Sequence, residues 1–170
     1  MFHKGYIGLL SAWKIFITKI QVTWINSIRG AFRIEILYEG HISIGHFLMS
    51  RGLLYLKSAS KGKLTIGDNV FFNHNCSITC AESIVIGNYC IFSNNLVIID
   101  HDHEIGENGV TETLASSPIV IEDSVWCGAN VTITKGVHIG TGAVIAANAV
   151  VVSDVEAHTI VAGVLAKRIK

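Results

Sequence analysis

Large apolar side chains recur at every sixth position along much of the chain. From Ile121 the sequence divides without a gap into six hexapeptides, IEDSVW, CGANVT, ITKGVH, IGTGAV, IAANAV and VVSDVE, in which the first residue is large and apolar and the fifth is small and apolar. Four more hexapeptides of this kind start at Ile66, Phe72, Ile86 and Phe92. Amphipathic strands have a period of two and helices a period near 3.6, so neither explains this pattern.

The fourth position of these hexapeptides predicts a turn in every repeat. Eight of the ten residues there are Asn, Gly or Asp, which tolerate a left-handed backbone conformation. Short strands joined by such turns, with two inward apolar positions per hexapeptide, predict an all-β fold, a parallel β-helix in which three hexapeptides make one triangular coil. The pattern is irregular between Gly40 and Lys63, which we interpret as early coils or a cap.

The segment before the repeats has a helical pattern instead. Apolar residues three or four positions apart predict an amphipathic helix that ends near Gly30; they are Leu10, Trp13, Ile17, Ile20, Trp24 and Ile28. Two interpretations stay open. The helix packs on its own domain or on a neighbouring subunit, or it lies in a membrane interface, for which lysines beside tryptophans are typical.

The charge distribution divides the chain at Lys63. Residues 1–63 contain nine Lys and Arg against Glu35 and Glu39, whereas residues 64–170 contain four against eleven Asp and Glu, so the two parts carry +7 and −7. A net charge of zero argues against nucleic-acid binding, but the basic part leaves an anionic membrane surface or ligand open. Lys14 and Lys19 interrupt the first apolar stretch, so neither a membrane span nor a signal peptide is predicted. We therefore expect a cytoplasmic protein with reduced thiols.

The sequence DHDH at 100–103 marks an interruption of the repeat. Continuing the hexapeptide frame through IIDHDH would put Asp102 at an inward position, where an unpaired carboxylate is costly. The chain is therefore expected to leave the prism near His101 and to return after a polar excursion loop at 104–118. A histidine at the base of such a loop is suited to take the proton of an attacking hydroxyl group.

Residues 66–167 resemble the hexapeptide-repeat acyltransferases, especially their galactoside, maltose and polysaccharide O-acetyltransferase branch. The resemblance rests on IGDNVFFNHN at 66–75, DHDH at 100–103, DSVWCGANVTITKGVHIG at 123–140 and VAGVLAK at 161–167. It implies a left-handed coil, a homotrimer with active sites between adjacent prisms, and acetyl transfer from acetyl-CoA to a sugar or glycan acceptor in polysaccharide or glycan biosynthesis. Acetylation of an antibiotic or other xenobiotic, and a non-catalytic scaffold, stay open as alternatives.

The resemblance also implies roles for individual residues. His101 aligns with the catalytic histidine of the family, and backbone N–H groups near Gly128 and Ala129 are candidates for stabilising the oxyanion. The acceptor candidates are Asn73, Asp100, Asp102, His103 and Trp126. The acetyl-CoA candidates are Gly128, Ala129, Ala147, Ala162, Gly163, Lys167 and Arg168.

Several of these assignments have alternatives. Asn73 also fits a structural corner residue, Trp126 an outward surface residue, and Arg168 a solvated terminus. Ser153 replaces the lysine that the family commonly uses for a coenzyme A phosphate, and Leu165 replaces a proline.

Cysteine and histidine chemistry is not favoured by the sequence. Cys76, Cys90 and Cys127 fall at inward positions, where cysteine is an apolar filler, whereas Cys80 does not. No C-x-x-C spacing occurs. A zinc site would recruit His74, His101 and His103, but their spacing differs from that of the carbonic anhydrases with this fold, so no metal is expected.

These patterns predict three regions. Residues 1–40 form the N-terminal helix and cap, residues 41–160 form the β-helix with its excursion loop at 104–118, and residues 161–170 form a C-terminal tail.

Overall fold

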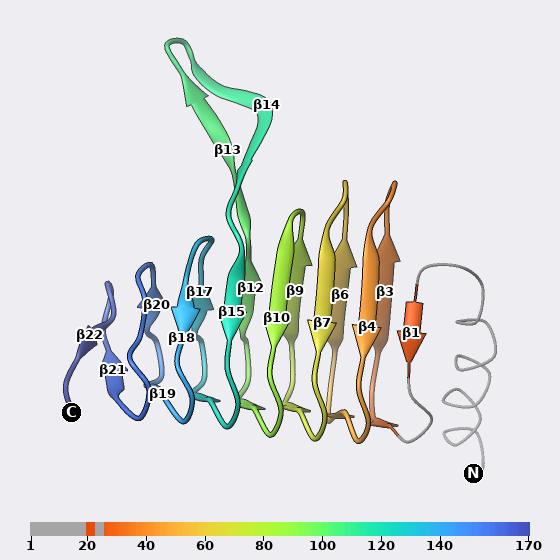
Figure 1. Ribbon diagram of the computed structural model, residues 1–170, viewed down its shortest axis with the longest axis vertical. Helices are drawn as coiled ribbons and strands as arrows, with labels where there is room; N and C mark the ends of the chain where they lie inside the picture. Colours follow the sequence, from red (N-terminus) through yellow and green to blue (C-terminus); the bar gives the residue numbers. More distant parts are fainter. Residues whose placement is uncertain (1–19, 23–25) are drawn as a thin grey trace.

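A computed structural model describes residues 20–22 and 26–170 as a parallel β-helix with three sheets, A, B and C (Figure 1). Sheet A contains β1 (Ile20–Val22), β4 (His41–Ile44), β7 (Lys63–Ile66), β10 (Ser83–Ile86), β15 (Ile119–Ile121) and β18 (His138–Ile139). Sheet B contains β2 (Ser27–Ile28), β5 (Met49–Ser50), β8 (Phe71–Phe72), β11 (Ile91–Phe92), β16 (Trp126–Cys127), β19 (Val144–Ile145), β21 (Ile160–Ala162) and β22 (Lys167–Arg168). Sheet C contains β3 (Phe32–Ile36), β6 (Leu54–Ser58), β9 (Cys76–Cys80), β12 (Val97–Ile99), β17 (Thr132–Ile133) and β20 (Val150–Val151).

Each coil runs from sheet A through sheet B to sheet C, and the next coil stacks on it in parallel register. We name the three edges of the prism A–B, B–C and C–A, after the sheets that the turns there connect. Because coils follow one another along the axis, position in the sequence is also position along the prism. The two ends of the described chain therefore lie at opposite ends of the molecule (Figure 1).

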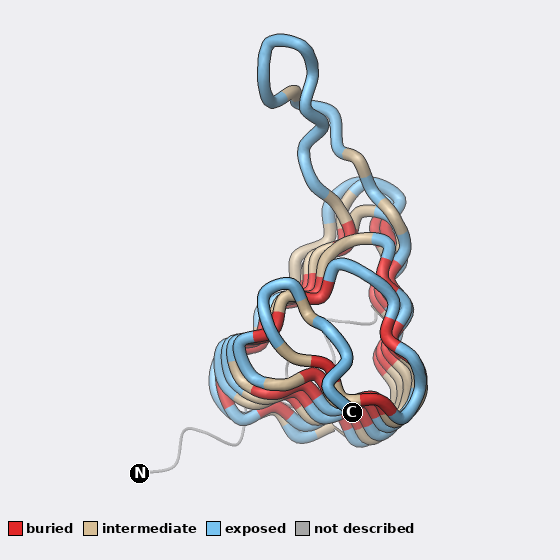
Figure 2. Tube along the Cα trace, turned by 90° about the vertical axis from the view of Figure 1, so that its left-hand side faces the viewer, coloured by how far each residue is buried: buried red, intermediate tan, exposed pale blue. Residues whose placement is uncertain are grey.

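The core is a stack of the predicted inward residues. Ile66, Ile86, Ile121 and Ile139 follow one another in sheet A and are at most 1% exposed. The rings of Phe72 and Phe92 stack between neighbouring coils with centroids 4.9 Å apart. Seen along the prism, buried positions face the interior and exposed ones the outside (Figure 2). The parallel β-helix predicted from the period of six is confirmed.

The predicted turn positions have the backbone conformation that Asn and Gly favour. Nine of the ten fourth positions have φ between 58° and 76°, Asp154 being the exception. On the B–C edge the side-chain amides form a ladder: Asn75 donates to Asn95 over 2.9 Å, Asn95 to Asn130 over 2.8 Å, and Asn130 to Asn148 over 3.0 Å. Each amide thus ties its own coil to the next one.

The helix predicted through Ile28 is wrong for the described residues. Ile20–Val22 pairs with Ile42–Ile44, and Ser27–Ile28 pairs with Met49–Ser50, both in parallel. Pairing with a strand of the next coil stabilises these residues as strands, and this tertiary contact outweighs the helical spacing of their apolar side chains. The remaining helix positions before Ile20, and Trp24, lie outside the described residues.

The region boundaries also change. Strands β1 to β3 belong to the three sheets, so the β-helix includes residues before 41, and the segment between Gly40 and Lys63 forms regular coils. At the other end, the predicted tail at 161–170 is an antiparallel pair in which Val161 is opposite Arg168, closing sheet B.

The predicted excursion loop is an antiparallel hairpin. It is formed by β13 (His101–Gly106) and β14 (Gly109–Ser116), with His101 opposite Ser116. The hairpin projects from the C–A edge, well beyond the turns of the other coils (Figures 1 and 2). Antiparallel pairing satisfies the backbone groups of this polar segment, which a free loop would leave to water.

Candidate functional site

Asp100 and His101 lie where the chain leaves the prism. β12 ends at Ile99, which is in register with Thr79 of the coil below. Asp100 therefore stacks above Cys80, which itself is in register with Ser58. All three side chains are fully buried at the C–A edge, and the hairpin begins at the next residue.

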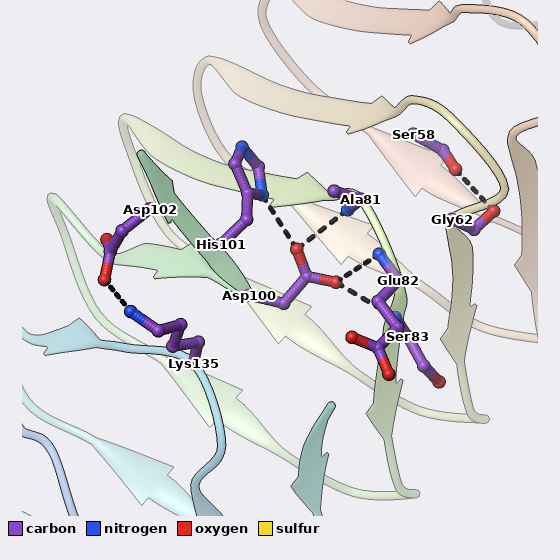
Figure 3. A network of polar contacts seen from close by, with 9 residues as sticks. All are labelled: Ser58, Gly62, Ala81, Glu82, Ser83, Asp100, His101, Asp102 and Lys135. Atoms are coloured by element: carbon purple, nitrogen blue, oxygen red, sulfur yellow. Dashed lines mark hydrogen bonds and ion pairs between the residues drawn. The ribbon is translucent and has the colours of Figure 1, made fainter. Parts of the chain in front are cut away.

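The Asp100 carboxylate is fully occupied by hydrogen-bond donors (Figure 3). It accepts backbone N–H groups of the turn between β9 and β10, from Ala81 at 2.7 Å, Glu82 at 2.9 Å and Ser83 at 3.0 Å. The ring Nδ1 of His101 lies 2.8 Å from Oδ1 of the same carboxylate. Three N–H donors stabilise the ionised form of the carboxyl group, which can then only accept from the ring.

This contact orients the ring of His101. Because Nδ1 carries the proton that it donates to Asp100, Nε2 of the neutral ring has the free electron pair. The side chain is one-fifth exposed, at 20%, so it reaches the surface while Asp100 does not. A buried carboxylate that fixes the tautomer of an exposed histidine is an arrangement suited to general base catalysis.

The other members of DHDH point elsewhere. Asp102 is exposed and forms an ion pair with Lys135 of the coil above (Figure 3). Nδ1 of His103 lies 3.0 Å from the carbonyl oxygen of Thr111, across the hairpin. His101 and His103 therefore have different partners, although they lie two residues apart in one strand, a spacing that places side chains on the same face.

One assignment from the sequence needs correction here. Asp102 is exposed, as expected where the repeat is interrupted, and Asp100 is the inward residue at the exit. The sequence analysis assigned Asp100 to the acceptor, but a side chain that is 0% exposed has no access to one. Its contacts are with His101 and with N–H donors of the coil below, which the repeat pattern does not reveal.

Cys80 is the second buried group that sequence analysis did not place. It is fully buried like the other three cysteines, and none of the four forms a disulfide. Burial, and then the neighbouring Asp100 carboxylate, raise the pKa of the Cys80 thiol. Burial also raises the pKa of Cys90 to about 11 and that of Cys76 and Cys127. All four are thus protonated fillers at neutral pH.

Several acetyl-CoA candidates and Asn73 share the B–C edge. Asn73 follows β8, and its Oδ1 lies 2.8 Å from Nδ1 of His74. Two coils above the Asn73 turn, Gly128 and Ala129 follow β16, and Ala147 follows β19 one coil further. A Cβ on Gly128 would lie 2.6 Å from the backbone nitrogen of Ala147, so the coils approach more closely here than any side chain permits.

The remaining candidates lie near the C-terminal end. Gly163, just after Ala162 and β21, accepts a hydrogen bond from the Val150 N–H at 3.1 Å. Lys167 and Arg168 form β22 and border a cavity of about 330 Å³. Ser153 also borders this cavity. The guanidinium Nη1 of Arg168 donates to Oε2 of Glu156 over 2.7 Å.

Trp126 lies on the outer face of sheet B. It is 49% exposed and is in register with Ile91 below and Val144 above. The structure thus places it on an outer surface, two residues before the B–C turn that starts at Gly128.

One chain does not bring all candidates together. His101 lies on the C–A edge and Asn73 on the B–C edge, and the five-residue strand β9 runs between these edges. At about 3.3 Å per residue the separation is roughly 16 Å, too far for one acceptor hydroxyl to contact both side chains. The candidate site consists of two half-sites on different edges.

Residues 20–22 and 26–170 contain neither a cluster of metal ligands nor a membrane-spanning helix. No three His, Cys, Asp or Glu side chains there are grouped as metal ligands would be. No helix there is long and apolar enough to cross a membrane.

Comparisons with known proteins agree with this architecture. A family model, the hexapeptide repeat of succinyl-transferase, matches residues 63–99 and 118–153, which are the coils on either side of the hairpin. The Escherichia coli K12 protein WbbJ, described as a lipopolysaccharide biosynthesis O-acetyl transferase, is 34% identical over 142 residues, covering 78% of this chain and 72% of WbbJ.

Solved structures are similar as well. A hexapeptide-repeat acetyltransferase of Vibrio cholerae, determined with acetyl coenzyme A, has a TM-score of 0.61 and 26% identity over 85% of this chain and 69% of its own. The N-acyltransferase AntD of Bacillus cereus, with dTDP and 3-hydroxybutyryl-CoA, has a TM-score of 0.75 at 19% identity over 99% and 89%, a likeness of fold alone.

Proposed function

Because the chain belongs to the hexapeptide-repeat acyltransferases, we propose that it transfers the acetyl group of acetyl-CoA to a sugar hydroxyl group with His101 as the general base. The observation that carries the proposal is the Asp100–His101 pair at the exit of the coil. A scaffold without activity has no need of a buried carboxylate that orients an exposed ring. The relative WbbJ supports a sugar acceptor and a role in polysaccharide assembly.

The proposed reaction is a direct transfer. Nε2 of His101 takes the proton of the acceptor hydroxyl as its oxygen attacks the thioester carbonyl carbon. The tetrahedral intermediate then expels the sulfur of coenzyme A, and the imidazolium returns its proton to that sulfur. Asp100 keeps the ring oriented and stabilises its charged form, and it is not itself protonated.

The two half-sites support a homotrimer. A second copy of the prism that packs alongside the first brings a B–C edge next to the neighbour's C–A edge, so that Asn73 and the coenzyme A candidates face His101 of the adjacent chain. Closed threefold symmetry makes three such sites. A left-handed sense of the coil is part of the same proposal.

The acetyl donor is proposed to lie along the B–C edge. Gly128, Ala129 and Ala147 carry little or no side chain on this edge, so the pantetheine arm can lie against the backbone. The Gly128 N–H is donated to the carbonyl oxygen of Ile145 at 2.8 Å, which leaves the N–H of Ala129 as the proposed donor to the oxyanion. Lys167 and Arg168 at the C-terminal cavity are the proposed phosphate contacts, a role in which they replace the lysine missing at Ser153. Four unpaired buried thiols and a cytosolic donor support a cytoplasmic location.

One assay tests donor and acceptor class together. The protein is incubated with acetyl-CoA and a panel of free, nucleotide-linked and lipid-linked sugars, amino sugars and an aminoglycoside, and thiol release is followed. The proposal expects acceptor-dependent release with a hydroxyl-bearing sugar and its loss in His101→Ala. Release only with amino acceptors, or equal rates in His101→Ala, would contradict it.

A further inference from the structure

The N-terminal end of the prism carries exposed basic side chains without acidic partners. Arg29, Lys61 and Lys63 are exposed, and no carboxylate of a described residue lies within 4 Å of their charged groups. Glu35 is engaged by Arg33 and Lys57. Cations left unpaired in this way are available to an external anion.

The charge of this end differs from that of the coils beyond it. Among the described residues up to Lys63, six Lys and Arg stand against Glu35 and Glu39, a net charge of +4. Most of the eleven acidic residues that follow lie in the middle coils and the hairpin, five of them between Asp100 and Glu112. A negatively charged surface therefore attracts the N-terminal end of the prism and repels its hairpin.

Exposed apolar side chains surround the same end. Leu37, Phe47 and Leu53 are 38%, 48% and 43% exposed, and they lie in turns on the C–A, A–B and B–C edges respectively. A prism packed alongside covers one face and leaves at least one of these edges free. Apolar groups on all three edges, together with unpaired cations, fit a surface that is met end-on.

Phe47 occupies a costly backbone position. Its φ is 58°, and the corresponding turn of the next coil has Asn69, also at φ 58°. Asparagine favours this left-handed conformation, whereas a bulky aromatic residue does not. Tyr89, at the same turn two coils further along, also has φ 59° and is exposed, so this backbone conformation is common to the A–B edge. What distinguishes Phe47 is an exposed apolar ring beside the unpaired cations.

We propose that the N-terminal end of the prism docks on an anionic phospholipid surface. Arg29, Lys61 and Lys63 supply the attraction to the headgroups, and Leu37, Phe47 and Leu53 enter the interface. The partner is a bilayer rather than nucleic acid because apolar side chains accompany the cations.

Docking would fix the distance between His101 and the bilayer surface. Three strand spacings separate β3, in the first coil, from β12 in sheet C, so Asp100 and His101 lie about 14 Å along the prism axis from β3. A glycan linked to a lipid in the same bilayer extends to that height. This consequence rests on the proposed acetyl transfer, whereas the docking does not.

Vesicle flotation tests the docking with the full chain and without acetyl-CoA. We expect binding to vesicles of phosphatidylcholine mixed with phosphatidylglycerol, weak binding to phosphatidylcholine alone, and loss of binding at high salt. Each basic residue near the surface is worth about a fivefold change in partitioning, so the triple change Arg29→Gln, Lys61→Gln, Lys63→Gln lowers binding about a hundredfold. Phe47→Asn, which suits the backbone, also weakens it.

Matched controls lie at the C-terminal end of the prism. Lys170→Gln and Ile169→Ser, both exposed there, keep full vesicle binding. The proposal is overturned if the wild-type chain does not float with the anionic vesicles, or if the triple variant floats as well as wild type, which would assign binding to the residues before Ile20. It is also overturned if Phe47→Asn dissociates an oligomer, which would make that edge an interface between copies. Thiol release measured in parallel without vesicles reports the transfer separately.

Discussion

Oδ1 of Asp100 lies 2.8 Å from Nδ1 of His101, and the two side chains differ sharply in exposure, at 0% and 20%. The carboxylate cannot move because three backbone N–H groups of the preceding coil hold it. The hydrogen bond at Nδ1 therefore holds the ring on its buried side, and Nε2 lies on its exposed side. Regular coils and a buried carboxylate thus position this histidine, although it lies at the foot of a projecting hairpin.

Replacing His101 by alanine removes the proposed base. A positioned base contributes about 10²- to 10⁴-fold, so kcat should fall by that factor while the Kd of acetyl-CoA stays nearly unchanged. Steady-state kinetics with a calorimetric titration of acetyl-CoA measure both. His103→Ala is the comparison, and it should act mainly on the acceptor KM. The assignment fails if the two phenotypes are exchanged.

Replacing Asp100 by alanine should destabilise the fold as well as the site. Three partly buried N–H groups lose their acceptor, which costs on the order of 3 kcal/mol. Thermal unfolding should therefore begin at a lower temperature. Asp100→Asn retains one acceptor oxygen and should lose less stability, yet still lower kcat, because its amide cannot hold His101 as a carboxylate does. Equal kcat in Asp100→Asn and wild type would deny Asp100 a positioning role.

The repeat predicts the inward residues because each one depends only on the period within its own coil. The burial of Asp100 did not follow from it, because the N–H donors at 81–83 are contributed by another coil; the frame indicated only that the chain leaves the prism near His101. Similarly, the spacing around Ile20 fits a helix locally, but pairing with Ile42 in the next coil decides for a strand. What the sequence misses are contacts between coils.

Two substitutions in the asparagine ladder on the B–C edge distinguish the stability lost with the side-chain hydrogen bonds from that lost by backbone strain. Asn130 has φ 60°, accepts from Asn95 and donates to Asn148. Asn130→Ala loses both hydrogen bonds and strains the left-handed backbone, which costs about 1–2 kcal/mol for the backbone alone. Asn130→Gly loses the same bonds without that strain. Thermal melts should rank wild type, Gly and Ala in falling order, and an Ala variant as stable as Gly would contradict the argument.

Glu122 should make stability depend on pH in the acid range. Hydrogen bonds from the Thr141 hydroxyl and backbone N–H, and then from His138, lower its pKa from 4.5 to about 2. A carboxyl group with a depressed folded pKa stabilises the fold above its unfolded pKa, and this contribution is lost as the pH falls from 4.5 through 2. Melting temperatures of wild type and Glu122→Gln should therefore differ at pH 6 and converge toward pH 2. A constant difference would exclude this titration.

Co-expression of two inactive variants tests whether a site is shared between chains. His101→Ala lacks the base but keeps the B–C edge, whereas Ala147→Trp blocks the proposed groove on the exposed B–C edge and keeps the base. In randomly assembled trimers about a quarter of the interfaces combine an intact His101 with an intact neighbouring edge, so the mixture should regain about a quarter of wild-type activity. Each variant alone should stay inactive. A site contained within one chain would give no recovery, because every chain then carries one of the two defects.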